Sequence, residues 1–353
     1  MSEAAASITR GLKLLAERIA ALPDALAAEA SRPLPSPATW PARPYAVTGA
    51  GGSEGPARIF SDRLARAGIP ARFVPLSAFA ASSPPVTPDH RLVIVSQGLS
   101  PNARLALAHR HRVAHCVVIT AILPDHEGNE RARLLAEATA EGHHVITHGP
   151  KREDELLVRI LGPTLATLVA VRLSGALLGH PVEVAGLVAA VSRALSAAPG
   201  GELAPGAVCG LVVSGDAGAR AHGLRWKILE ALACGDPPVW DVLQFAHGPL
   251  QQYYEQPLTL ITLEGNDDAH AELFGRLGQV VPAHHRLVRL KATLPEPLAW
   301  FEHDAMLNTL VMRQLERSPR DLVQWPGKGR DQALYAIEQP LEPRSLTTEA
   351  KKR

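Results

Sequence analysis

The stretch 46-AVTGAGGSEG-55 decides the fold. It is a short apolar run that ends in a turn rich in glycine, and a run with helical spacing follows it at 55–68. A strand that passes through such a turn into a helix is the opening unit of an α/β fold with a parallel sheet. The stretch 211-LVVSGDAGA-219 has the same pattern and opens the C-terminal half of the chain. Together the two stretches indicate an internal duplication of one α/β unit.

Strand-like and helix-like runs alternate after each of these openings. In the first half we expect strands at 45–50, 71–76, 91–96, 116–121 and 144–147, and helices at 55–68, 102–110 and 128–141. In the second half we expect strands at 207–215, 238–245, 258–265 and 286–292, and helices at 218–233, 267–277 and 295–316. This alternation predicts an α/β protein with two parallel sheets in tandem, each covered by helices.

Segments rich in proline or glycine separate these units. One is the connector at 32–44, which contains five prolines, and another is 196-SAAPGGELAPG-206. Residues 5–30 have helical spacing, which predicts one or two leading helices. The expected organisation is N-terminal helices and connector at 1–43, a first domain at 44–195, a linker at 196–206, a second domain at 207–345 and a tail at 346–353.

The composition is that of a globular protein with an aliphatic core. Of the 353 residues, 46% are apolar and 4% are aromatic, and the length suffices for two ordinary domains. The net charge of +1 argues against a nucleic-acid partner, which needs a strong positive field. The most apolar stretch, 156–179, contains Arg159, Pro163 and Arg172, so it predicts a buried helix and no membrane span. The first residues lack the layout of a signal peptide, which favours a cytoplasmic location.

The cysteines and histidines form no pattern typical of a metal site or a disulfide framework. The three cysteines have no CxxC spacing, so we expect buried free thiols in a reducing compartment. The histidine-rich segments at 109–115, 143–144 and 284–285 lack an HExxH or similar arrangement. We therefore expect neither a metal nor another cofactor.

The first glycine-rich turn is a candidate ligand site, because ligands of open parallel sheets bind beyond the carboxyl ends of the strands. Gly51 and Gly52 allow backbone N–H groups to approach an anion closely, and Ser53 adds a hydroxyl. The spacing does not fit a Walker A loop and fits a dinucleotide-binding fingerprint poorly. The alternative interpretation is that this segment is only a turn.

Two further strands of the first half end in polar side chains. Ser96, Gln97, Ser100 and Asn102 follow the third expected strand where a helix begins, which suits a phosphate or the hydroxyls of a sugar. Ser100 is followed by a proline and is therefore also an N-cap signal, so simple helix capping is the alternative. Thr147 ends the fifth expected strand and is a further candidate for substrate binding.

The segment 224-LRWKILEALACGDPPVWDVLQFAHGPLQ-251 carries the candidate catalytic groups. Lys227 and Glu230 are three residues apart in an expected helix, so they share one face. A carboxylate held near a cation and His247 is suited to moving a proton between neighbouring sugar carbons. The alternatives are an exposed helical pair worth ~0.3 kcal/mol and a structural histidine at a turn.

These motifs resemble the sugar isomerase (SIS) family, specifically a double-SIS protein similar to the isomerase part of glucosamine-6-phosphate synthase. The resemblance covers roughly residues 40–340. It rests on the turn at 51–53, the Ser96-Gln97 pair that opens the second loop, the Lys-x-x-Glu at 227–230 and the His-Gly-Pro at 247–249. After Ser96-Gln97 this chain continues with Gly-Leu-Ser-Pro, where the family has Ser-Gly-Glu-Thr.

The resemblance implies two SIS-type domains in tandem, each a flavodoxin-like, doubly wound parallel sheet. It implies that Glu230 shuttles a proton between C1 and C2 of the sugar, that His247 opens the sugar ring and that Lys227 organises the site. In the family the neighbouring subunit often contributes the histidine, so the resemblance also implies a homodimer with the active site near the subunit interface. Lys328 is the candidate for a further lysine, in a segment that closes over the substrate.

The expected function is that of an enzyme acting on a sugar or sugar phosphate through an enediol or enolamine. Aldose–ketose isomerisation and amino-sugar deamination or deglycation share this proton transfer between adjacent carbons, and none of them needs a nicotinamide or a metal. The alternative is a non-catalytic regulatory protein that binds a sugar phosphate. The presence of the Lys, Glu and His set and the lack of a helix-turn-helix segment near residue 1 favour the enzyme.

Overall fold

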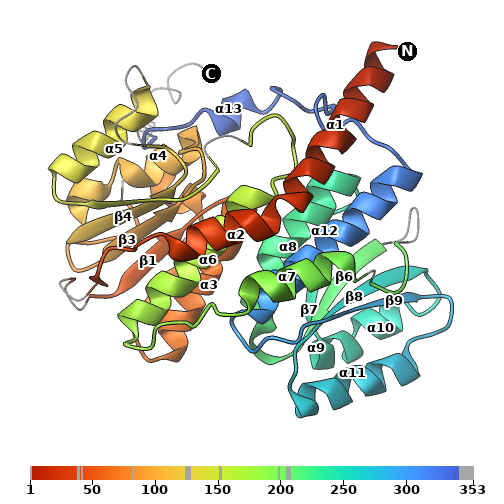
Figure 1. The fold of residues 1–353 in the computed structure, drawn as a ribbon. Coiled ribbons are helices and arrows are strands. Elements are labelled where there is room, and N and C mark those ends of the chain that lie inside the picture. The colour runs from red at the N-terminus through yellow and green to blue at the C-terminus, as the bar shows by residue number, and fades with distance from the viewer. Residues whose placement is uncertain are drawn as a thin grey trace, which may run out of the picture.

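The computed structural model of this protein describes residues 2–37, 40, 43–81, 83–123, 129–150, 153–197, 199–203 and 208–341. Within them the chain forms two parallel β-sheets, each with helices on both faces (Figure 1). The expected tail at 346–353 lies outside the described residues, as do 204–206 of the expected linker. The α/β class that the alternation of strands and helices predicts is confirmed.

The first sheet has five parallel strands in the order β2-β1-β3-β4-β5. The strands are β1 (Tyr45–Thr48), β2 (Ala71–Phe73), β3 (Arg91–Val95), β4 (His115–Thr120) and β5 (His144–Thr147). This is the flavodoxin-like order, in which the chain runs to one edge of the sheet and then crosses back. Each of the five strands expected in this half is confirmed. The central strands β3 and β4 are buried along their whole length, which explains their continuous apolar sequences.

Two pairs of helices cover the two faces of the first sheet. The helices are α3 (Glu54–Arg66), α4 (Pro101–Leu107), α5 (Glu130–Ala140) and α6 (Leu161–Leu177). Leu92 and Val93, neighbours on β3, point to opposite faces, because side chains alternate along a strand. Val93 packs in the cluster that contains α3 and α6, whereas Leu92 packs in the cluster that contains α4 and α5. The doubly wound arrangement expected for this half is therefore present.

The second sheet has four parallel strands in the order β7-β6-β8-β9. The strands are β6 (Val208–Val213), β7 (Val239–Asp241), β8 (Leu258–Glu264) and β9 (Arg286–Lys291). The strand expected at 238–245 is wrong beyond Asp241. The Asp241 carboxylate accepts hydrogen bonds from the N–H groups of Leu243 and Gln244 and so begins a helix. The helices that follow are α9 (Val242–Ala246) and α10 (Pro249–Gln252).

The neighbours Val212 and Val213 of β6 point to opposite faces of the second sheet. Val213 packs in the cluster that contains α8 (Gly218–Leu232) and α12 (Ala299–Arg317). Val212 packs in the cluster that contains α9 and α11 (Asp268–Val280). Helices α8 and α9 therefore lie on opposite sides of this sheet (Figure 1). This separation matters for the candidate catalytic groups, which lie on α8 and at the end of α9.

A large apolar cluster joins the two halves of the molecule. It contains side chains of α6, α8 and α12 together with α1 (Glu3–Ala20), α2 (Leu22–Ser31) and α7 (Leu187–Ser196). Helix α6 is buried over most of its length, so the buried helix expected within 156–179 is confirmed from Leu161 to Leu177. No helix in the described part of the chain is both long and apolar enough to cross a membrane.

The cysteines are free thiols, as expected, but they differ in exposure. Cys116 on β4 and Cys209 on β6 are buried, and burial raises the pKa of each thiol to about 12. Cys234 follows α8 and is only partly buried, so the expectation of a buried thiol is wrong at this position. The α8 helix ends just before it at Leu232, which leaves Cys234 in the turn that leads to β7.

After α12 the chain returns to the first half. Residues 318–341, here called the C-terminal strap, run past α1 towards α4 (Figure 1). The Leu157 N–H donates to the Leu322 carbonyl over 3.0 Å, and the Asn102 side-chain amide donates to the Leu334 carbonyl over 2.9 Å. The helix of this strap is α13 (Gln332–Tyr335). The strap therefore connects the end of the second half with the carboxyl edge of the first sheet.

Candidate functional site

The turn Gly51–Ser53 follows β1 at the carboxyl edge of the first sheet and contacts both α6 and α8. Gly52 packs directly on Pro163 of α6, because a Cβ added to Gly52 would lie 2.8 Å from the proline Cγ. Gly51 has a φ of +56°, which glycine adopts without strain. The Ser53 hydroxyl does not cap α3 and makes no hydrogen bond with the described residues. This hydroxyl is therefore free to meet a ligand.

The second predicted loop uses most of its polar side chains to stabilise itself. The Ser96 hydroxyl accepts a hydrogen bond from the Ser100 N–H over 3.3 Å, and the Ser100 hydroxyl accepts one from the Ala103 N–H over 3.4 Å. Asn102 donates to the C-terminal strap. Ser100 is thus the helix cap that the sequence offers as an alternative. All three predicted ligand-binding side chains, Ser96, Ser100 and Asn102, are engaged with protein groups.

Gln97 reaches from this loop to the start of α6. Its Nε2 lies 3.3 Å from the Glu153 carboxylate, and its amide packs on the backbone of Gly162. Glu153 is buried and accepts hydrogen bonds from the N–H groups of Ile160, Leu161 and Gly162 over 2.7, 2.8 and 2.8 Å. The carboxylate satisfies the free N–H groups at the start of α6. Glu153 could not be identified from the sequence, because the residue lies outside the helix that it caps.

Thr147 lies apart from the first two loops. It ends β5, an edge strand that β4 separates from β3. Its carbonyl accepts a hydrogen bond from Arg32 over 3.0 Å. The next residue, His148, is buried, and burial lowers its pKa to about 4, so the ring is neutral at physiological pH. The structure does not bring Thr147 together with the turn Gly51–Ser53.

Lys227 is a buried link between helices. Its ammonium group forms an ion pair with the Asp304 carboxylate on α12 and donates a hydrogen bond to Asn308 Oδ1 over 3.0 Å. Asp304 also accepts a hydrogen bond from the Thr164 hydroxyl of α6 over 2.8 Å. Lys227, Asp304, Asn308 and Thr164 are all buried. The lysine that the sequence pairs with Glu230 therefore finds its carboxylate partner on another helix.

Glu230 lies on α8 beside Arg159, a residue of the segment that leads into α6. The side chain is partly buried, and burial raises the pKa of the carboxyl group to about 7. The positive charges of Arg159 and Lys227 and a hydrogen bond from the Arg159 backbone oppose this shift without cancelling it. A carboxyl group with a pKa near 7 accepts and releases a proton at physiological pH, as a general base between two carbons requires.

His247 and Lys328 do not meet Glu230 within one chain. His247 is exposed at the end of α9, on the face of the second sheet opposite to α8. Lys328 lies in the C-terminal strap, where its ammonium group donates to the Val323 carbonyl over 2.7 Å and lies 4.7 Å from the centre of the Trp325 ring. Lys328 is therefore held by its own turn.

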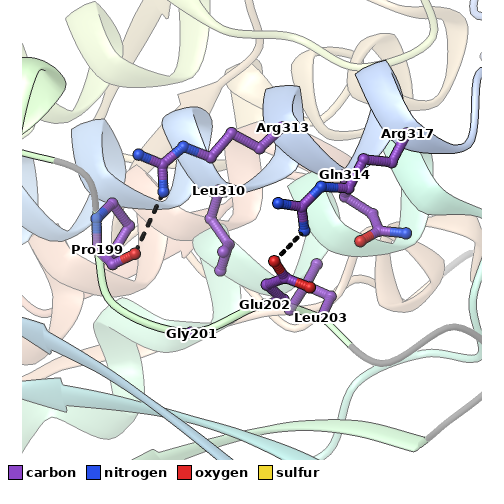
Figure 2. A pocket seen from close by; sticks show the side chains of 8 residues that line it. All are labelled: Pro199, Gly201, Glu202, Leu203, Leu310, Arg313, Gln314 and Arg317. Carbon is purple, nitrogen blue, oxygen red and sulfur yellow. Dashed lines mark hydrogen bonds and ion pairs between the residues drawn. The ribbon is translucent and has the colours of Figure 1, made fainter.

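A cavity of about 250 Å³ lies between the segment 199–203 and the C-terminal part of α12. Figure 2 shows Arg313 and Arg317 reaching from α12 towards this segment. Arg313 donates to the Pro199 carbonyl over 3.3 Å, and Arg317 forms an ion pair with Glu202 over 2.6 Å. The cavity contains none of the predicted site residues. Within the described residues no group of three or more His, Cys, Asp and Glu side chains is arranged to hold a metal ion.

Neither a model of a known protein family nor a curated protein matches this chain in sequence. Solved structures do match it. The C-terminal domain of glucosamine-fructose-6-phosphate aminotransferase from Francisella tularensis has a TM-score of 0.67 and 13% identity, over 89% of this chain and 98% of that chain. Tagatose-6-phosphate ketose/aldose isomerase from Escherichia coli has a TM-score of 0.64 and 14% identity, over 88% and 95% of the two chains.

Glucosamine-6-phosphate deaminase from Thermotoga maritima has a TM-score of 0.63 and 13% identity, over 88% of this chain and 96% of that chain. At such identities the match concerns the arrangement of the elements, and it extends over both halves of this chain. The matches cover 88–89% of this chain, which has two parallel sheets, the first in flavodoxin-like order. The chain therefore has the two-sheet fold of the sugar isomerase (SIS) proteins that its motifs resemble.

Proposed function

We propose that this protein catalyses proton transfer between adjacent carbons of a sugar phosphate, as an aldose–ketose isomerase or a related amino-sugar deaminase or deglycase. The observation that carries the proposal is Glu230, whose pKa burial raises to about 7. It lies on α8, and this helix contacts the turn Gly51–Ser53, where the Ser53 hydroxyl has no partner among the described residues. The fold adds support, since proteins named for isomerase and deaminase activity on sugar phosphates share it.

Glu230 is the base in this proposal. Its carboxylate takes the proton from one carbon, an enediol or enolamine forms, and the same carboxyl group returns the proton to the neighbouring carbon. Because the group is partly enclosed by protein, the proton exchanges slowly with water during this step. A base with a pKa near the working pH gives the best compromise between being deprotonated and binding a proton firmly.

We propose that His247 comes to the site from a second subunit of a homodimer, as the family resemblance implies. Within one chain His247 lies on the other side of the second sheet from Glu230, so one chain alone does not complete the site. Its surroundings suit an interface. Leu243 and Tyr254 on the same side are 57% and 56% exposed, and a protein interface gains stability by burying apolar side chains of this kind.

The test combines binding with exchange. Fructose 6-phosphate, glucosamine 6-phosphate and tagatose 6-phosphate are each added to the protein in deuterated buffer, and NMR follows deuterium uptake at C1 and C2. Uptake that Glu230→Gln abolishes while binding persists supports the proposal. Glu272→Gln is the matched control, because Glu272 is exposed on α11 and pairs with Arg276. Binding without uptake for the wild-type protein would instead favour the non-catalytic regulatory protein.

A further inference from the structure

Arg159 lies where the three parts of the candidate site meet. Its Cβ is 4.0 Å from the position of a Cβ on Gly52, so the residue lies against the glycine turn. Arg159 precedes α6, and the N–H group of Leu161 at the start of α6 donates a hydrogen bond to the Glu153 carboxylate. The backbone of Arg159 hydrogen-bonds Glu230, and its positive charge acts on that carboxylate. Arg159 is therefore near the turn and the proposed base at the same time.

The guanidinium of Arg159 forms no hydrogen bond and no ion pair with the described residues, although the charges of Glu153, Glu230 and Asp154 act on it. Its Nη1 is buried and has no hydrogen-bond partner, and no carboxylate of the described residues forms an ion pair with it. Glu153 is close enough to act on its charge, but both oxygens of Glu153 are already engaged by backbone N–H groups and Gln97. A buried cationic donor without a partner is unfavourable, and such a group calls for an explanation. The residue as a whole is only partly buried, so the guanidinium is not sealed from solvent.

Two other described cations at this edge of the sheet, Arg131 and Arg104, are already engaged. Arg131 donates to the Gly98 carbonyl over 2.9 Å, and Arg104 forms ion pairs with Glu130 and Glu338. The neutral side chains of the second loop are occupied as well. An anion that enters the candidate site therefore meets a guanidinium that forms no hydrogen bond or ion pair with the described residues. Guanidinium groups bind phosphate and carboxylate in the same bidentate way.

We propose that Arg159 binds an anionic group of the substrate, a phosphate or a carboxylate, between the turn Gly51–Ser53 and Glu230. This proposal rests on the proposed function only in taking that region as the substrate site. In this proposal Arg159 recognises the anion, and the hydroxyl-rich second loop with Ser96 and Ser100 does not. The Ser53 hydroxyl and the N–H groups of the glycine turn complete the set of donors.

The experiment measures binding by calorimetry with three probes on the full-length protein. Glucose 6-phosphate carries a phosphate, gluconate carries a carboxylate and glucose carries no charge. We expect at least one of the two anions to bind more tightly than glucose. Arg159→Gln weakens that binding by about 10- to 100-fold, since it removes a charge-assisted pair of hydrogen bonds. Arg159→Lys keeps the charge but not the planar fork. We therefore expect its affinity for the anion to lie between those of the wild type and Arg159→Gln.

Arg172→Gln is the matched control. Arg172 belongs to α6 as well, and it donates to the carbonyls of Glu29 and Arg32. Arg172 lies about 17 Å along α6 from Leu161, the first residue of that helix. We expect unchanged affinity in this variant. Glu230→Gln should change the affinity in the opposite direction, because removing a neighbouring negative charge tightens the binding of an anion. If Arg159 had a purely structural role, we would not expect Arg159→Gln to weaken and Glu230→Gln to tighten the binding of the same anion.

The outcomes separate the proposals. If Arg159→Gln and Arg159→Lys bind the anion as tightly as the wild type, or if glucose binds as tightly as both anions, the assignment of Arg159 is wrong. If Arg159→Gln does not fold, the other two variants still test the assignment. It then requires weaker anion binding by Arg159→Lys and tighter anion binding by Glu230→Gln. The relative affinities of glucose 6-phosphate and gluconate identify the anion. Anion binding through Arg159 without deuterium uptake at C1 or C2 would overturn the proposed reaction and leave the binding assignment intact.

Discussion

The main chains of Gly55 and Gly223 touch where α3 crosses α8. A Cβ added to Gly55 would lie 2.7 Å from the Gly223 Cα, and one added to Gly223 would lie 2.8 Å from the Gly55 Cα. Next to this contact Trp226 Nε1 donates to the Glu54 carboxylate over 2.9 Å. The crossing holds the glycine turn of the first half at a fixed distance from the helix that carries Glu230.

Gly223→Ala tests this crossing. The added methyl group forces the two helices apart, and we expect a loss of about 1–3 kcal/mol in the free energy of unfolding, together with lower turnover. Chemical denaturation and the exchange assay measure the two effects. Gly275→Ala is the control, because Gly275 lies inside α11 and a Cβ there meets nothing within 4 Å. That variant should be as stable as the wild type or slightly more stable, since alanine favours the helix. Equal stability of both variants would contradict the close contact.

Glu230 should make stability fall as the pH rises. Its pKa is about 7 in the folded protein and 4.5 as the ordinary value, so the folded state binds more protons between these pH values. The free energy of unfolding therefore decreases as the pH rises through that window. We expect Glu230→Gln to be more stable than the wild type at pH 8, by on the order of 2–3 kcal/mol, and equally stable at pH 4.

The pH dependence of catalysis should have the opposite sign to that of stability. Because the base must be deprotonated to act, kcat/KM should rise with pH through about pH 7.

Lys227→Met should act mainly on stability. It leaves the buried Asp304 carboxylate without its cation, which costs about 3–5 kcal/mol when a buried pair is broken. We expect the double variant Lys227→Met with Asp304→Leu to recover much of this loss, because both charges are then gone. Urea denaturation of the two variants measures the difference. If Lys227→Met were as stable as the wild type but inactive, Lys227 would be a catalytic group and not a structural link.

His115 should make the protein sensitive to acid. Its ring is buried, its Nε2 lies 2.6 Å from Nδ1 of His144, and burial, with Arg91 nearby, lowers its pKa from 6.5 to about 4. The unfolded chain binds the proton first as the pH falls from 6.5 to 4, so stability is lost by about 1.4 kcal/mol for each pH unit in that range. His115→Gln should flatten this part of the stability curve. His111→Gln, the same change at an exposed position, is the control for the substitution itself.

The strands were predictable for a physical reason. A parallel strand that is covered by helices on both faces needs apolar residues at consecutive positions, and β3 and β4 have such sequences. The strand predicted at 238–245 shows the limit of this signal. Its apolar residues fit a strand or a buried helix equally well, and the Asp241 side chain decides for the helix by capping it.

The site was less predictable, because its contacts join residues that are distant in the chain. Glu230 could be identified from its spacing to Lys227, but the partner of Lys227 is Asn308, 81 residues away, together with Asp304. Arg159 interrupts an apolar run, and the sequence alone explains it only as a mark against a membrane span. Its position beside the glycine turn depends on how α6 packs against that turn, which no local pattern encodes.

The two ends of the chain cross between the halves in opposite directions. Helix α1 packs on α12 of the second half, and the C-terminal strap brings the Leu341 N–H to within 2.8 Å of the Ala80 carbonyl in the first half. Each half is thus packed against a terminal segment that is joined in sequence to the other half. We expect a protease cut in the segment between the halves to leave a tight non-covalent complex, whereas either half produced alone would lack part of its own core. The two halves are interlocked by these contacts, and we expect them to unfold as one cooperative unit.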